Sequence, residues 1–451
     1  MNGHRRWVRR RLLPLTLAGG LVAGLLGSTR ADRSPPLFAA GLLGNPTALA
    51  AVPPGQADGA AYLPGSTVLR LADGRLRYLP PGAAAPATVG AGDPAALAAV
   101  VRERAWLAAG TVPGVTADER QAAAASLLFL RLLVRPGGAA IAAQTPYWAY
   151  VWPRDASFAA AALAVTGHRA EAAEVVGFLT RSQRPDGTWP ARSHPDGRPV
   201  SDGRPSQLDA AGWVPWAAWL ASDQGRDRRP AAAWWPTVRA AADVAAGSLD
   251  AAGLPPAVAD YWERREHAPT LGTAAALRVG LRAAARLAGR LGHRTRQAAW
   301  RQAADRLDRA VRERFGPSGY QRHPHGGGAD AAVTWLAPPF GPPDPLVRAA
   351  VTTAWRRLGV GGGAVPGRPW RGSDPWTPTT ASFALAAMAG GDRPAAEARL
   401  GWLLGHRTTL GAFPERVGRE DGAPRSVAPL AWTHAIVLLT LVSREGRVPA
   451  P

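Results

Sequence analysis

Residues 116–134 read TADERQAAAASLLFLRLLV, and this stretch contains the start signal and the apolar run of a helix. Thr116 followed by Glu119 is a capping-box pattern, and it precedes an apolar run that ends near Val134. A second stretch repeats apolar residues every three to four positions and stops before Gly316. Its apolar residues are Trp300, Ala303, Leu307, Val311 and Phe315. Both stretches predict helices with one apolar face.

The same periodicity extends from about residue 95 to residue 445 and predicts about twelve helices. Pro153, Pro230 and Pro394 each stand near the start of one of them, where a missing N–H costs nothing. No long alternating strand pattern interrupts this region. We therefore expect an all-α domain of helical hairpins closed into an (α/α)6 barrel. An open α-solenoid would contain similar helices, but the chain has no repeat of about 34 or 40 residues.

Residues 1–31 have the pattern of a signal peptide. Five arginines lie between His4 and Arg11, an uncharged apolar run follows at residues 12–27, and small residues come next. We expect the protein to be exported, and so to be secreted or held at the cell surface by an uncleaved N-terminal membrane anchor. Arg9-Arg10-Arg11 also resembles a twin-arginine signal, which leaves the export route open.

Residues 32–94 are rich in Pro, Gly and Ala. Asp73-Gly74 between two short apolar runs predicts a β-hairpin within them. We expect this segment to be otherwise irregular and to pack on the helical domain of residues 95–445.

The composition excludes several classes of function. The net charge is +20, but the chain has no lysine, its 53 basic residues are arginines scattered along the predicted helices, and no nucleic-acid-binding motif is present. We therefore expect no nucleic-acid partner. The absence of cysteine excludes disulfides, thiolate metal sites and thiol catalysis. The 18 tryptophans, against 6 tyrosines and 8 phenylalanines, favour either a sugar-binding cleft or a tryptophan-rich core.

Three stretches place acidic residues beside aromatic ones, as cleavage of a glycosidic bond by two carboxyl groups requires. YWAYVWPRD at residues 147–155 sets Arg154 and Asp155 at a helix start, where they can donate to and accept from sugar hydroxyls. DYWERRE at residues 260–266 sets Glu263 behind two aromatic residues, where partial desolvation favours the protonated form. FPERV at residues 413–417 sets Glu415 in an extended or turn segment.

Each stretch also has a plainer interpretation. Asp155 is then a favourable charge at a helix N-terminus, and each glutamate is the surface partner of an adjacent arginine. His323-Pro324-His325 lies in a Gly-rich loop without a nearby cluster of acids, a setting more typical of solvated histidines than of a metal site, so we expect no metal.

Taken together and in this order, the three stretches resemble glycoside hydrolase family 15, the glucoamylase-type enzymes, which include glucodextranases and some trehalases. The matching motifs are Tyr-x-Trp-x-Arg-Asp at residues 150–155, Trp-Glu at 262–263, Pro-Glu at 414–415 and Leu-x-Trp at 430–432. Shorter likenesses occur at residues 137–143, 207–209, 329–331 and 374–376. The resemblance covers roughly residues 100–440.

The resemblance implies an (α/α)6 catalytic domain that releases glucose from an α-glucoside or α-glucan, acting from the chain end, with inversion and without a cofactor. It implies that Glu263 is the general acid and Glu415 the general base. The residues that it assigns to substrate binding are Trp152, Arg154, Asp155, Trp262, Arg265 and Trp376.

The chain departs from the family in ways that leave the substrate open. Fungal members have a second glutamate after the acid, where this chain has Arg264, and the bacterial form Trp-Glu-x-Arg fits better, with Arg265 as its arginine. Either Arg368 or Arg371 matches a further cleft arginine. The glucosidic linkage, the length of the oligo- or polysaccharide and the oligomeric state stay undetermined.

Two other functions fit the same barrel. A phosphorylase would use phosphate in place of an activated water, which would make Glu415 dispensable. A carbohydrate-binding or scaffold protein would need neither glutamate.

Overall fold

The computed structural model describes residues 38–45, 47–367, 370 and 372–451. The expected signal peptide and the two candidate cleft arginines, Arg368 and Arg371, lie outside these ranges. Within them, none of the helices is both long and apolar enough to span a bilayer.

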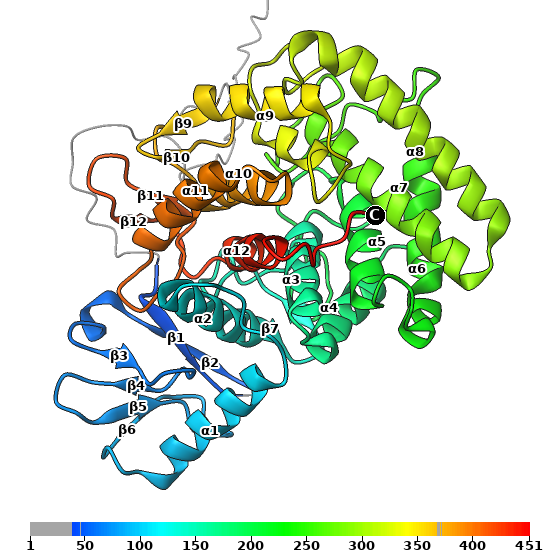
Figure 1. Ribbon diagram of the computed structural model, residues 1–451. Coiled ribbons are helices and arrows are strands. Elements are labelled where there is room, and N and C mark those ends of the chain that lie inside the picture. The colour runs from blue at the N-terminus through cyan, green and yellow to red at the C-terminus, as the bar shows by residue number, and fades with distance from the viewer. Residues whose placement is uncertain (1–37, 46, 368–369, 371) are drawn as a thin grey trace, which may run out of the picture. The chain divides into compact units, whose positions relative to one another are not determined.

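The chain before the helical domain forms two small antiparallel sheets and one helix (Figure 1). The strands of the first sheet are β1 (Gly41–Gly44) and β2 (Leu49–Val52), which the 3-10 helix η1 (Pro54–Gln56) follows. Those of the second are β3 (Ala61–Tyr62), β4 (Leu69–Arg70), β5 (Leu76–Tyr78) and β6 (Ala87–Val89). β4 and β5 pair on either side of Asp73-Gly74, and helix α1 (Pro94–Ala108) packs on β5 through Ala96 and Val100.

Six inner elements form a closed ring in the described part of the chain, because each contacts the next and the last contacts the first. They are α3 (Pro153–Val165), α5 (Ala210–Ala221), α7 (Leu271–Leu291), η3 (Ala331–Leu336), α10 (Thr377–Ala389) and α12 (Ala431–Ser443). Each has an outer helix packed on it, in the order α4 (Arg169–Arg181), α6 (Arg228–Gly247), α8 (Arg294–Phe315), α9 (Pro345–Leu358), α11 (Arg393–Gly405) and α2 (Ala117–Leu133). The ring of paired helices is the expected (α/α)6 barrel (Figure 1).

Local signals predicted the helix ends well. Thr116 caps α2 through the expected capping box with Glu119, α3 begins at Pro153, and α8 ends at Phe315. The fourth inner element differs, because η3 is a 3-10 helix of 6 residues rather than an α-helix. Pro338 and Pro339 follow it closely, and proline lacks the N–H that a continuing helix needs.

The loops contain short strands that no alternating pattern could have revealed, since each has two residues. They are β7 (Val134–Arg135), β8 (Ala139–Ala140), β9 (Gly359–Val360), β10 (Gly363–Ala364), β11 (Arg416–Val417) and β12 (Pro424–Arg425). A 3-10 turn, η2 (Gly316–Ser318), follows α8 directly.

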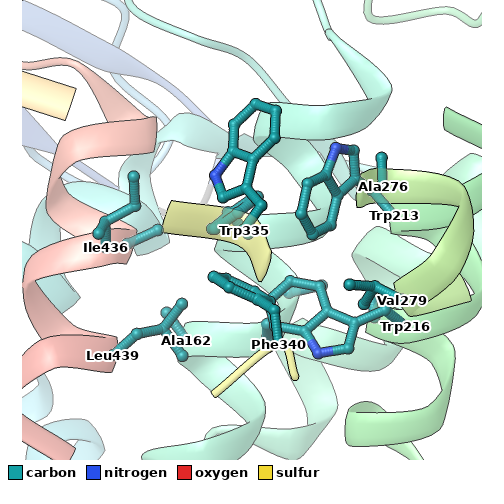
Figure 2. Packing of buried hydrophobic residues seen from close by; sticks show 14 of the residues in the cluster. Ala162, Trp213, Trp216, Ala276, Val279, Trp335, Phe340, Ile436 and Leu439 are labelled. Carbon is teal, nitrogen blue, oxygen red and sulfur yellow. The ribbon is translucent and has the colours of Figure 1, made fainter. Parts of the chain in front are cut away.

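Aromatic side chains fill the middle of the ring (Figure 2). The Trp213 ring lies 5.2 Å from that of Trp335 and 5.5 Å from that of Phe340, in both cases edge to face. Trp216 lies 5.4 Å from Phe340 and 5.7 Å from Trp213, so the three rings contact one another. These tryptophans are buried, so part of the tryptophan content belongs to the core, as the plainer interpretation holds.

Helices α5 and α7 approach so closely that a methyl group does not fit between them. A Cβ on Gly280 would lie 2.4 Å from the Cα of Gly212. We expect Gly280→Ala to destabilise the fold by about 1–3 kcal/mol, because overpacking a core forces backbone apart. The measurement is the free energy of unfolding in denaturant.

Gly401 on α11 provides the matched control, since no atom lies within 4 Å of the Cβ that alanine would add. Gly401→Ala should stabilise the protein by about 0.5–1 kcal/mol, because alanine is the better helix former. Equal unfolding free energies for the two variants would contradict the close contact at Gly280.

Candidate active site

The residues selected from the sequence gather where the inner helices begin. Trp152 is the N-cap of α3, and Arg154 and Asp155 lie in its first turn. Trp376 is the N-cap of α10, and the loop with Trp262 and Glu263 precedes α7. Contacts between these segments, described below, bring them together at one end of the barrel.

Glu263 receives contacts from two distant segments. The indole N–H of Trp152 donates to its Oε1, and the guanidinium of Arg204 pairs with its Oε2. Its backbone has a φ of 57°, in the left-handed region that is costly for a residue with a side chain. The Glu263 N–H donates to the Asp260 carbonyl oxygen at 2.8 Å and closes this turn. The side chain is 18% exposed, so it stays accessible at the surface of the site.

Both backbone groups of Glu415 make hydrogen bonds to other segments. Its N–H donates to the Val427 carbonyl at 2.7 Å, and its carbonyl accepts from the Thr377 N–H, at the start of α10, at 3.0 Å. The Ser426 hydroxyl donates to Oε2. Burial raises the pKa of Glu415, while hydrogen bonds from Ser426 and Trp148 and the charge of Arg416 oppose the rise. A carboxyl group with a raised pKa is a stronger base once it is ionised.

Arg154 and Asp155 form a buried polar group. Arg154 Nη1 lies 3.1 Å from Gln207 Oε1 and 3.2 Å from Asp209 Oδ2, and Nη2 lies 3.3 Å from Asp155 Oδ2. Its guanidinium carbon lies 5.0 Å from the centre of the Trp432 ring. Burial raises the pKa of Asp155 to about 6, and the charges of Asp209 and Glu415 add to the rise, against the opposing charge of Arg154.

Several buried polar atoms of the candidate site have no hydrogen-bond partner among the described residues. Four of them are donors, Arg154 Nε, Gln207 Nε2, Trp376 Nε1 and Trp432 Nε1, and one is an acceptor, Asp155 Oδ2. Buried polar atoms are normally satisfied by protein, water or ligand. The site therefore suits a ligand that presents several hydroxyl oxygens.

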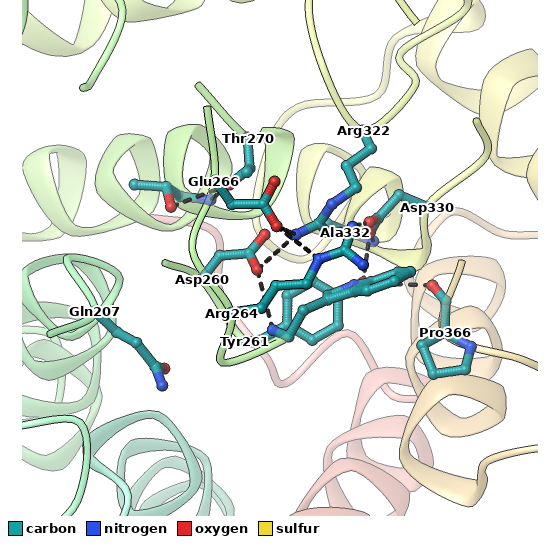
Figure 3. A network of polar contacts seen from close by, with 12 residues as sticks. Gln207, Asp260, Tyr261, Arg264, Glu266, Thr270, Arg322, Asp330, Ala332 and Pro366 are labelled. Carbon is teal, nitrogen blue, oxygen red and sulfur yellow. Dashed lines mark hydrogen bonds and ion pairs between the residues drawn. The ribbon is translucent and has the colours of Figure 1, made fainter. Parts of the chain in front are cut away.

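A second polar network includes residues on both sides of Glu263 in the chain (Figure 3). Arg322 is 1% exposed and pairs with three carboxylates: Asp330 at 2.6 Å, Asp260 at 2.8 Å and Glu266 at 2.6 Å. Its guanidinium carbon lies 4.2 Å from the centre of the Trp262 ring. Because Asp260 and Glu266 flank Glu263 in the sequence, Arg322 braces the loop that presents the glutamate.

The aromatic residues that line the site are joined edge to face. Trp262 lies 5.7 Å from Trp370, and Trp370 lies 5.1 Å from Trp376. Arg265, in contrast, is exposed and makes no hydrogen bond or ion pair within the described ranges. Its assignment to substrate binding stays a prediction.

Sequence reasoning missed several residues of the site. Arg322, Arg204 and Ser426 lie in loops without a helical or strand period, so the sequence contains no local signal for them. The stretches at residues 207–209 and 329–331 were recognised as similar to the family, but their Asp209 and Asp330 were not assigned to the site. Only the contacts with Arg154 and Arg322 reveal what they do.

No family model matches the chain. The chain is 27% identical over 348 residues to an uncharacterized glycosyl hydrolase of Methanocaldococcus jannaschii, and the match covers 71% of this chain and 55% of that protein. The chain thus spans about half the length of this curated relative.

Solved structures share the fold at low sequence identity. A wild-type glycosidase matches with a TM-score of 0.63 and 24% identity, over 74% of this chain and all of that one. A bacterial glucoamylase complexed with acarbose matches with a TM-score of 0.59 and 16% identity, over 79% of this chain and 62% of that one. The glucoamylase of Saccharomycopsis fibuligera matches with a TM-score of 0.60 and 12% identity, over 72% of this chain and 94% of that one. The expected (α/α)6 fold is confirmed.

Proposed function

We propose that this protein is a glycoside hydrolase with Glu263 as general acid and Glu415 as general base. One observation carries the proposal: the segments that hold two carboxyl groups, 152 positions apart in the chain, both adjoin the starts of inner helices, and several buried donors at those starts have no partner among the described residues. The charge of Glu415 contributes to the raised pKa of Asp155, which supports a site that Asp155 and Glu415 share. The names of the similar proteins, glycosyl hydrolase, glycosidase and glucoamylase, support the same activity.

The reaction is inverting. Glu263 protonates the leaving oxygen, and Glu415 takes a proton from the water that attacks the opposite face of the sugar, which requires a carboxyl separation of about 6.5–9.5 Å. Ser426 and Trp148 orient Glu415, and Trp152 orients Glu263. No metal or cofactor takes part in this chemistry.

The substrate is an α-glucoside, and a single glucose leaves from the chain end. Arg154 and Asp155 bind the hydroxyls of the terminal sugar, since they lie buried in the first turn of α3 and each has a polar atom without a hydrogen-bond partner among the described residues. Trp262 and Trp376 give apolar faces to the sugar rings. One of the similar structures is a glycosidase in complex with glucose, and another is a glucoamylase complexed with acarbose, which supports a saccharide as the substrate.

The test is glucose release from maltose, isomaltose, trehalose and soluble starch, with the anomer followed by NMR. We expect β-glucose as the first product from at least one of them, because inversion at an α-linkage gives the β-anomer. The same reactions run with inorganic phosphate distinguish a phosphorylase, which would release glucose 1-phosphate instead. Folded protein that gives neither product would refute the proposal and favour a binding role.

A further inference from the structure

The contact between Arg204 and Glu263 favours the opposite protonation state from the one that a general acid needs. A guanidinium next to a carboxyl group favours the ionised form. A general acid must be protonated when the leaving oxygen departs. Arg204 also reaches Asp202 through its Nε at 3.1 Å, and it is 35% exposed. The charge on Arg204 therefore opposes catalysis for as long as the contact lasts.

The segment that contains Arg204, residues 201–206, contacts the rest of the described chain through side-chain hydrogen bonds and ion pairs. Residues 201–206 make no backbone–backbone hydrogen bond to other described residues. They are held by the pair between Arg192 and Asp202, by a bond of 3.2 Å from Arg184 to Ser206, and by Arg204 itself. All but Pro205 are exposed. Moving this segment breaks few contacts, whereas the backbone of Glu415 is bonded to its neighbours on both sides.

The other charged groups on the segments around Glu263 are already paired. Arg192 pairs with Asp202, Arg264 with Glu266 at 3.0 Å, and Arg154 with Asp155. The remaining charged groups near the two glutamates are Asp260, Arg265, Arg322, Asp209 and Arg416. Among the described residues, Arg204 alone forms an ion pair with Glu263.

We propose that Arg204 is a positioning residue for the acid, which the leaving group of the substrate displaces. In the free enzyme Arg204 keeps Glu263 ionised and fixed against Trp152. When the leaving group enters, residues 201–206 move away, Glu263 takes up one proton from solvent, and its Oε2 meets the glycosidic oxygen. The inference rests on the proposed role of Glu263 as general acid.

The pH dependence of kcat/KM and of kcat tests this, because the first reports the free enzyme and the second the complex. Arg204→Met should move the alkaline limb of kcat/KM upward by about one pH unit, since Glu263 then stays protonated to higher pH. The alkaline limb of kcat should stay in place, because Arg204 has already left in the complex. Arg204→Lys should restore the wild-type kcat/KM profile.

Arg198→Met is the matched control. Arg198 lies six positions earlier, pairs only with Asp196 among the described residues and is 78% exposed, so this variant should leave both profiles unchanged. Equal shifts of both limbs after Arg204→Met would overturn the displacement. An unchanged kcat/KM profile would overturn the role of Arg204 altogether.

A titration of the unliganded protein separates this inference from the proposed function. The carboxyl carbon of Glu263, labelled with 13C and assigned with Glu263→Gln, is followed by NMR against pH. Arg204→Met should raise the titration midpoint, and an unchanged midpoint would refute the pair. If the midpoint rises but no glycoside is cleaved, then the contact stands and the assignment as a hydrolase fails.

Discussion

Replacing Glu415 with Gln should lower kcat by about 10²- to 10⁴-fold while the protein stays folded, because an amide cannot accept the proton of the attacking water. The change keeps the size of the side chain and its capacity to accept from Ser426. The measurement is kcat for the substrate identified by glucose release, together with the melting temperature. The melting temperature should change little, since Gln removes a carboxyl group whose ionised form is disfavoured by burial.

The control is Glu420→Gln, five positions later in an exposed turn, which should keep full activity. In the wild-type protein, activity should also fall as the pH drops through the raised pKa of Glu415, since the protonated carboxyl group is no longer a base. A Glu415→Gln enzyme that hydrolyses its substrate at the wild-type rate would exclude Glu415 as the base and favour phosphorolysis, in which it is dispensable.

Replacing Arg322 with Met should cost about 3–5 kcal/mol of stability, because it leaves buried carboxylates without their partner. Asp260 and Asp330 are both buried, and Arg322 pairs with each of them and with Glu266. Arg322→Lys should not restore the stability of the wild-type protein, since a single ammonium group cannot reproduce the planar guanidinium that spans three carboxylates. The measurement is the free energy of unfolding of both variants in chemical denaturant.

Arg75→Met is the control for this experiment. Arg75 pairs with Asp73 at the surface, where the two side chains are 59% and 50% exposed, and its loss should cost less than about 1 kcal/mol. If Arg322→Met costs no more than Arg75→Met, then the network of Figure 3 does not brace the Glu263 loop, and the position of the acid must depend on Trp152 and Arg204 instead.

Local sequence signals were sufficient to predict a helix end wherever the residues that fix that end lie in the same turn. The capping box at Thr116 and the proline at position 153 act on the turn in which they stand, so α2 and α3 begin where predicted. The fourth inner element was harder, because the 3-10 helix η3 depends on the Asp330 side chain accepting from Ala332 and on the prolines that follow. Its place in the ring is visible only in its contacts with α7 and α10.

The same distinction between local and distant causes applies to the candidate site. Glu263 and Glu415 were chosen from their immediate neighbours, and the structure brings their segments to one end of the barrel. Arg322 could not be found in this way, because its partner Asp260 is 62 positions away and the intervening sequence has no matching period. Ser426, 11 positions after Glu415, becomes its hydrogen-bond donor only because β11 and β12 pair.

Residue patterns alone were enough to predict the helical class and the ends of several helices and to select the two glutamates as candidates, because apolar spacing, capping residues and aromatic neighbours act over a few positions. Which arginines pair with the acidic residues of the Glu263 loop is visible only in the folded chain. Arg204 reaches Glu263 and Arg322 reaches Asp260 because closure of the ring brings loops together that are far apart in the chain. Ion pairs depend on distance in space, and with 53 arginines in the chain no spacing rule could single out these two.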